Sequence, residues 1–302
     1  MSQDVNVLIT LDIHCYPDIE RDIPMLIEEA LKLFDDISIK ATFLFPAIYA
    51  EKFSRQVQLI LSHGHEIGCH GLTHNPDTER YNSLSYKEQK ALLSEAKKRI
   101  EDITHVEVAS FRSPAFKINA DTIKALDENG FKADLSVNPQ RLGFLSADIS
   151  NLGWIYSPRV PYHPDLRNPF KRGSSAIWEI PQSSFIMPFM SNTGIAFGKT
   201  FMKMFFKSLY LESRFKHNPI VYMLHIEDIY PVANKFMYKF EWKHLLPSKI
   251  YGFQLRYALL HNKSGSHIAR QNIELLKMMK NHKAVKFITA KEMVELLENK
   301  NN

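Results

Sequence analysis

Residues 5–14, which read VNVLITLDIH, decide the fold and raise the question of function. The apolar, β-branched run predicts a buried β-strand over residues 5–13. Side chains two positions apart on a strand share a face, so Asp12 and His14 point one way while Ile13 points the other. An acid and an imidazole presented together at the end of a buried strand indicate part of a functional site.

Outward from this strand, short apolar runs alternate with helical patterns. The predicted strands are residues 5–13, 40–47, 65–71, 108–114, 132–137, 219–228 and 284–289. The predicted helices are residues 22–36, 51–64, 85–102, 119–130, 269–276 and 290–300. This alternation is expected of βα units around a parallel sheet or barrel. Residues 138–185, rich in Pro, Ser and Arg, are predicted to form a long loop section near the substrate, and residues 1–302 to form one domain.

The composition is that of a globular protein and does not favour a nucleic-acid partner. The 302 residues include 45% hydrophobic and 24% charged residues, enough to bury a full core. The formal net charge of +5 is mildly basic, but the lysines are scattered and form no aromatic-basic motif.

Cysteine usage and the first residues favour a cytoplasmic location. The two cysteines, Cys15 and Cys69, cannot build a disulfide framework, which fits a reducing compartment. The N-terminus has an acid where a signal peptide would be basic. No apolar run reaches the ~18 residues of a membrane-spanning helix.

The segment HEIGCHGLTH, residues 65–74, places His70 and His74 four positions apart. A helical turn, or a loop after a strand, brings two such imidazoles together, so the pair suits zinc or a similar transition metal. Without a third ligand, they would equally well be solvated loop histidines. In our interpretation His14 supplies that ligand, and Asp12 beside the metal is the base that deprotonates a water molecule.

Five segments resemble, in order, the motifs of the polysaccharide deacetylases with NodB homology, which are metal-dependent carbohydrate N- and O-deacetylases. The segments are TLDIH (10–14), HGLTH (70–74), FRSPAF (111–116), DLSV (134–137) and YMLHIED (222–228). The resemblance covers most of the chain and implies a distorted (β/α) barrel, commonly with seven parallel strands. Sites in such barrels lie at the carboxyl ends of the strands, where these motifs are predicted to fall.

The resemblance implies a role for each matching catalytic residue. Asp12 would be the general base, and His225 the general acid that protonates the leaving amine or alcohol. Arg112 would pair with Asp12 and keep it ionised and oriented. Asp134 would orient or tune His225, as a carboxylate does for an imidazole in other sites.

The implied metal ligands include one departure from the family. His70 and His74 match its metal motif, but His14 stands where the family usually has aspartate or glutamate. A neutral imidazole there leaves the site one unit more positive, which acidifies a bound water further and alters the metal preference. Zinc is expected, with cobalt, nickel or iron as alternatives. Two other interpretations stay open: Asp18 replaces His14 as the ligand, or the metal is held weakly and His14 lines the pocket.

These features predict a metal-dependent hydrolase that removes an N-acetyl or other acyl group from an amino sugar. The absence of an export signal favours an intracellular substrate, such as a lipid-linked glycan intermediate. One alternative is hydrolysis of a C–N bond in a small cyclic amide or ureide, since relatives of the family act on such compounds. The other is a catalytically silent carbohydrate-binding barrel, against which Asp12 and His225 both argue because binding alone needs neither.

Residues 198–216 combine a basic stripe with large apolar side chains. Lys199, Lys203 and Lys207 recur every four residues on a predicted helix that is otherwise rich in Phe, Met and Leu. Such a helix suits peripheral contact with an anionic membrane surface. The alternative is an outer barrel helix whose apolar face packs against the core.

Overall fold

The computed structural model describes residues 4–14, 19–75, 77–141, 152–230 and 265–301, together with Trp242 and Leu246. Cys15 and the alternative ligand Asp18 lie outside these residues.

The first strand lies at the centre of the main sheet and pairs in parallel with three others. These four strands are β1 (Val5–Asp12), β2 (Ala41–Phe45), β9 (Ile220–His225) and β10 (Val285–Phe287). β10 pairs with the start of β1 and β2 with its end, while β9 pairs along most of its length. The register sets His225 beside Asp12, so two predicted catalytic residues lie at the same end of neighbouring strands.

The remaining strands continue the parallel sheet from β2 in chain order. They are β3 (Glu66–Cys69), β4 (Ser110–Phe111), β5 (Ala133–Asp134) and β6 (Trp178–Glu179). The expected distorted (β/α) barrel is therefore confirmed. Among the described residues the main sheet has eight strands, because the three-residue β10 pairs with a part of β1 that β2 does not reach.

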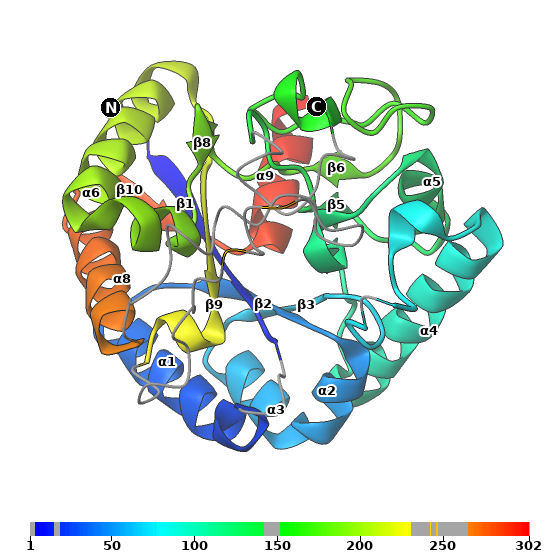
Figure 1. Cartoon of the computed structure of the whole chain (residues 1–302), viewed down its shortest axis with the longest axis horizontal. Helices are drawn as coiled ribbons and strands as arrows, with labels where there is room; N and C mark the ends of the chain where they lie inside the picture. The colour runs from blue at the N-terminus through cyan, green and yellow to red at the C-terminus, as the bar shows by residue number, and fades with distance from the viewer. Residues whose placement is uncertain are drawn as a thin grey trace.

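Helices cover the outside of this sheet, with β1 and β9 near the centre of the view in Figure 1. The helices are α1 (Ile23–Asp36), α2 (Ala47–Lys52), α3 (Ser54–Ser62), α4 (Tyr86–Thr104), α5 (Ala120–Glu128), α6 (Ser191–Lys216), α8 (Gly265–Lys280) and α9 (Ala290–Asn301). Short 3-10 turns are η1 (Glu20–Asp22), η2 (Tyr81–Ser83), η3 (Pro114–Phe116), η4 (Leu152–Ile155) and η5 (Ile226–Asp228). In the described part of the chain, no helix has the length and apolar character needed to span a membrane.

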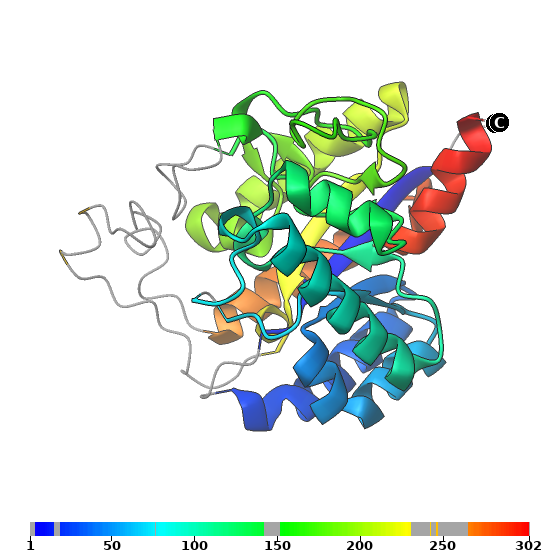
Figure 2. The same ribbon diagram turned by 90° about the vertical axis from the view of Figure 1, so that its right-hand side faces the viewer.

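The alternation of side chains along β1 separates the core from the site. Val7, Ile9 and Leu11 belong to the large hydrophobic cluster that the helices share. Leu8 belongs instead to a second cluster, which includes Met293 of α9. Figure 2 shows α9 at one end of the molecule and β1 running away from it. The polar residues that share the face of Leu8 on β1 therefore lie farther from α9, toward the carboxyl end of the strand.

Two sequence predictions of secondary structure need correction. The helix predicted over residues 51–64 is two helices, α2 and α3, because the backbone leaves the helical region at Phe53 (φ −110°, ψ 34°). The section 138–185, predicted as loop, contains β6. β6 is two residues long and is held by backbone hydrogen bonds to β5, so it leaves no alternating pattern in the sequence.

The gap between β6 and β9 is bridged by the segment that follows β6. Gln182 Nε2 donates hydrogen bonds to the carbonyl oxygens of Val221 (2.6 Å) and Phe189 (2.5 Å). Ser183 Oγ accepts the Val221 N–H at 2.9 Å, and Met190 forms a parallel bridge with Met223. Side-chain bonds thus substitute for a continuous strand ladder at this part of the barrel. The hairpin β7 (Ser184–Phe185) and β8 (Met187–Pro188) lies within the same segment.

Candidate metal centre

Three histidines from two strand ends meet at one end of the barrel. His14 follows β1, His70 follows β3, and His74 lies four residues further on. Potential ligand nitrogens of the three all lie within 4.8 Å of one another. The His14 ring centroid lies 5.6 Å from that of His70 and 4.5 Å from that of His74. The structure therefore brings all three predicted ligands together.

The hydrogen bonds of His70 leave one ring nitrogen available. His70 Nδ1 lies 2.8 Å from the carbonyl oxygen of Arg112, and because a carbonyl only accepts, Nδ1 carries the hydrogen. Nε2 then keeps its lone pair. It is buried and has no hydrogen-bond partner. A buried acceptor without a partner is costly, whereas a backbone carbonyl that accepts from the other ring nitrogen and fixes the tautomer is typical of histidine ligands, so this site fits a metal ion.

The charge state of the cluster also fits a cation. Burial lowers the pKa of all three imidazoles, and the neighbouring histidines lower those of His14 and His74 further. The pKa of His74 falls to about 3. The three rings are therefore neutral at physiological pH and present nitrogen lone pairs, which is the donor set that zinc takes.

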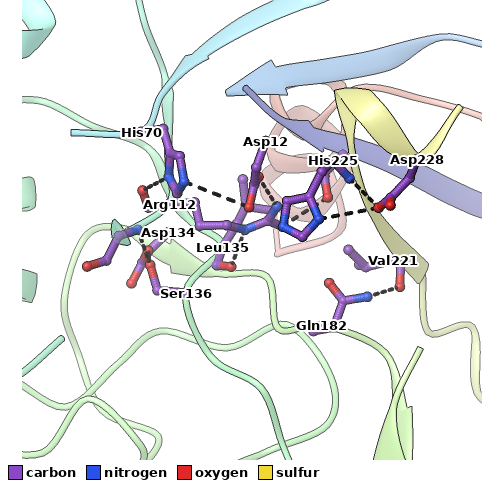
Figure 3. A network of polar contacts seen from close by, with 12 residues as sticks. Asp12, His70, Arg112, Asp134, Leu135, Ser136, Gln182, Val221, His225 and Asp228 are labelled. Carbon is purple, nitrogen blue, oxygen red and sulfur yellow. Dashed lines mark hydrogen bonds and ion pairs between the residues drawn. The ribbon is translucent and has the colours of Figure 1, made fainter. Parts of the chain in front are cut away.

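Asp12 lies beside this cluster and is held by Arg112. Arg112 Nη1 donates to Asp12 Oδ1 at 2.6 Å, so the expected pairing is present. Asp12 Oδ2 faces His70, 3.9 Å from Nε2, and Figure 3 shows Asp12 between His70 and His225. Burial would raise the pKa of Asp12, but the neighbouring charges, that of the Arg112 guanidinium first, outweigh it and lower the pKa. Asp12 is therefore an ionised carboxylate in a buried place.

Arg112 is fully buried and joins several parts of the site. Its Nε donates to the Leu135 carbonyl and its Nη2 to Thr10 Oγ1, both at 3.0 Å. Its own carbonyl accepts from His70, as described above. One residue thus fixes both the orientation of Asp12 and the tautomer of His70.

The carboxylate that contacts His225 is that of Asp228. His225 Nδ1 lies 3.3 Å from Asp228 Oδ2, and the His225 N–H donates to the same oxygen at 2.9 Å. Ser191 Oγ donates to it as well. Burial lowers the pKa of His225, but Asp228 outweighs it, and the pKa rises to about 9. His225 is therefore protonated at neutral pH.

The contact expected between Asp134 and His225 is absent from the described residues. Asp134 accepts a hydrogen bond from Ser136 Oγ and lies opposite Glu179 in the register of β5 and β6. Burial raises the pKa of Asp134 to about 6, and burial together with Asp134 raises the pKa of Glu179 well above its ordinary value. Asp134 is thus half of a buried carboxyl pair. The contact with His225 that the sequence prediction gave to Asp134 is made by Asp228.

Glu79 is a second residue that the sequence analysis missed. Its buried carboxylate accepts hydrogen bonds from the backbone N–H groups of Leu72, Thr73 and His74. A Cβ at Gly71, where φ is +84°, would overlap this carboxylate. The sequence gives little sign of this role, because Glu79 stands in a polar stretch typical of an exposed loop. A signal for Asp228 was present in the sequence, since this acid stands only three residues after His225.

Part of the chain is similar to known proteins. Residues 4–133 match the family model for polysaccharide deacetylases. The peptidoglycan deacetylase of Helicobacter pylori is 31% identical over 111 residues, which cover 37% of this chain and 36% of that protein. The match therefore spans about a third of this relative's length.

Two solved structures share the fold over nearly the whole chain. A candidate polysaccharide deacetylase from Mycobacterium smegmatis has a TM-score of 0.63 at 14% identity, covering 100% of this chain and 92% of that one. Puue allantoinase has a TM-score of 0.61 at 13% identity, covering 99% and 91%. At such identities the likeness shows the fold alone.

The fold and the site together define a (β/α) barrel with a histidine cluster at the carboxyl ends of its strands. Residues 4–133, which carry Asp12, Arg112 and the three histidines, match the polysaccharide deacetylase model, so the resemblance seen in the motifs is confirmed over this part of the chain.

Proposed function

We propose that this chain is a metal-dependent hydrolase that removes an N-acetyl or other acyl group from an amino sugar. The observation that supports it most is the place of Asp12, which lies ionised between a cluster of neutral imidazoles and the protonated His225. An ionised base and a protonated acid beside one centre are what amide hydrolysis needs, since a water loses a proton and the leaving nitrogen gains one.

His14, His70 and His74 would hold the metal. A divalent cation there would supply Lewis-acid polarisation of the acyl carbonyl and would lower the pKa of a water molecule. Neutral nitrogen donors suit zinc, and also cobalt, nickel or iron.

Asp12 takes the proton from the attacking water in this proposal. Arg112 keeps the carboxylate ionised and directs one oxygen away, so that the other faces the histidine cluster. His225 then donates its proton to the departing nitrogen, and Asp228 holds the ring in the orientation for that transfer.

The amino-sugar substrate rests on the family and on the name of the Helicobacter pylori relative. The intracellular or lipid-linked form of the substrate and the cytoplasmic location stay predictions from the sequence. A cyclic amide or ureide remains the second candidate, because an allantoinase shares the barrel and the fold does not separate the two reactions.

The test measures metal content and reaction products on the same protein. Elemental mass spectrometry of the natural chain and of His14→Ala should find about one zinc, cobalt, nickel or iron per chain, lost in the variant. Acetate release from N-acetylated sugar oligomers, abolished in Asp12→Asn, would support the proposal. Ring opening of a cyclic ureide without acetate release would favour the second candidate. A chain that binds the sugar equally well in both forms and releases no product would be the silent barrel.

We also propose that the outer face of α6 contacts an anionic lipid surface. Lys199 and Lys203 each lie 3.3 Å from Glu274 of α8, so these two lysines fix neighbouring helices. The face beside them keeps Met204, Leu211 and Phe215 exposed, and Phe215 is 82% exposed. Large apolar side chains next to lysines on one helix face suit an interface with anionic headgroups.

A further inference from the structure

We infer that Glu79 is a positioning residue, whose buried carboxylate fixes the loop at residues 72–74 and thereby aims His74 at the other two imidazoles. This inference rests on the proposed function, because it assigns a task within the proposed metal centre.

The backbone of the loop converges on the Glu79 carboxylate. Oε2 accepts the N–H groups of Thr73 and His74, both at 2.7 Å, and Thr73 Oγ1 at 2.9 Å. Oε1 accepts from the Leu72 N–H and from the hydroxyl of Tyr81 at 3.0 Å. Three consecutive N–H groups that point to one spot form an anion-binding concavity, and here a side chain of the same loop fills it.

This concavity requires an uncommon backbone at His74. Its φ is +60°, a left-handed conformation that non-glycine residues rarely adopt. The His74 N–H bond to Glu79 holds that conformation. From it the imidazole reaches ring-centroid distances of 4.5 Å to His14 and 4.8 Å to His70.

Glu79 is only 2% exposed, so water does not readily replace it as the acceptor. Without the carboxylate, three backbone donors would lose their partner at once, and the loop would turn to satisfy them. Any such turn moves His74, whereas His14 and His70 stay fixed directly after strands. The expected effect is therefore on metal binding.

The experiment compares Glu79→Gln with a matched variant, Glu66→Gln. Glutamine keeps the size of the side chain but removes its charge and adds donors where donors already point. Glu66 also accepts two hydroxyls and a backbone N–H, from Thr42, Ser110 and Lys291, yet it contacts no part of the 72–74 loop. Glu66→Gln disturbs a buried network of three hydrogen bonds and Glu79→Gln one of five, and only the Glu79 network supports a histidine of the cluster.

Cobalt titration followed by visible absorption, and zinc titration against a competing chelator, give readouts that do not depend on activity. We expect Glu79→Gln to weaken binding of both metals by about 10- to 100-fold and to change the cobalt spectrum. Glu66→Gln should leave affinity and spectrum unchanged. Thr73→Val, which removes the hydroxyl bond to Glu79 and the acceptor of the Asn75 N–H but keeps Glu79, should shift both readouts in the same direction by less.

Natural affinity and spectrum in Glu79→Gln would overturn the inference while leaving the metal-dependent function in place. If Glu79→Gln does not fold, Thr73→Val decides in the same way. A natural chain that binds neither cobalt nor zinc would overturn the metal-dependent function, and this inference with it.

Discussion

At the scale of single residues, the buried pair of Asp134 and Glu179 should make stability depend on pH. Both pKa values are raised in the folded chain, so above about pH 4 the folded state binds more protons than the unfolded state. The pair's contribution is therefore present at low pH and is lost as pH rises through about 6, the folded-state pKa of Asp134. Glu179→Gln cannot ionise and keeps the acceptor for the Val137 N–H. We expect it to exceed the natural chain in stability at about pH 8 by ~1 kcal/mol or more.

Thermal unfolding by circular dichroism between about pH 5 and pH 8 checks this. Glu128→Gln is the control, because its exposed carboxyl has a pKa lowered by hydrogen bonds to Lys90 and Tyr86 and so cannot cause a fall of stability at high pH. Parallel profiles for Glu179→Gln and the natural chain would contradict the prediction.

Sequence motifs located the residues that meet at the site but not the side chains that hold them. Asp12, Arg112 and the histidines stand at strand ends, where chain order already indicates a shared edge. The turn η5 brings the Asp228 carboxylate to the His225 ring, whereas the family motif had suggested Asp134 as the partner of His225. Glu79 was missed because its five hydrogen bonds exist only in the folded loop.

At the scale of elements, the outer face of α6 should decide contact with lipid. Serine at Met204, Leu211 and Phe215 together removes the three most exposed apolar side chains of α6 without touching the buried face of the helix. Because the apolar contribution is lost, we expect the triple variant to bind vesicles of anionic phospholipid at least about tenfold more weakly. Co-sedimentation with vesicles measures this binding.

A matched variant carries serine at Ile155 and Leu166, which are also exposed apolar residues but lie outside α6. It should bind like the natural chain. Equal binding of all three proteins, or no binding by the natural chain, would show that α6 is only an outer barrel helix.

Elements with a regular pattern of buried apolar residues were predicted well from the sequence, and very short elements were not. β1 and β9 are apolar runs that pair with each other in parallel, and α4 begins at a capping box of Ser85 and Glu88 that is visible in the sequence. β6 has two residues and derives its place from backbone bonds to β5. The break at Phe53 lies inside one continuous helical pattern, so the sequence did not separate α2 from α3.

At the scale of the whole molecule, the histidine cluster joins parts of the barrel that the sheet separates. β2 lies between β1 and β3, and the cluster spans across it from His14 to His70 and His74. The barrel itself follows from the alternation of strands and helices, which the sequence showed. The closure of the barrel through Gln182 could not be predicted from that alternation, because side-chain hydrogen bonds replace a strand there.

Metal removal should therefore lower the stability of the entire chain. A ligand that binds only the folded state at about 100 times its Kd adds about 2.7 kcal/mol, which for a chain of this size raises the Tm by roughly 5 °C. We expect the zinc-loaded protein to unfold at a correspondingly higher temperature than the chelator-treated protein in differential scanning calorimetry. His74→Asn should lose this difference, since it removes one ligand. His217→Asn is its matched control. His74 and His217 have φ of 60° and 58°, a conformation that asparagine tolerates, but His217 caps the end of α6, away from the cluster. A zinc shift that persists in His74→Asn, or is absent from the natural chain, would mean that no ion links these strands.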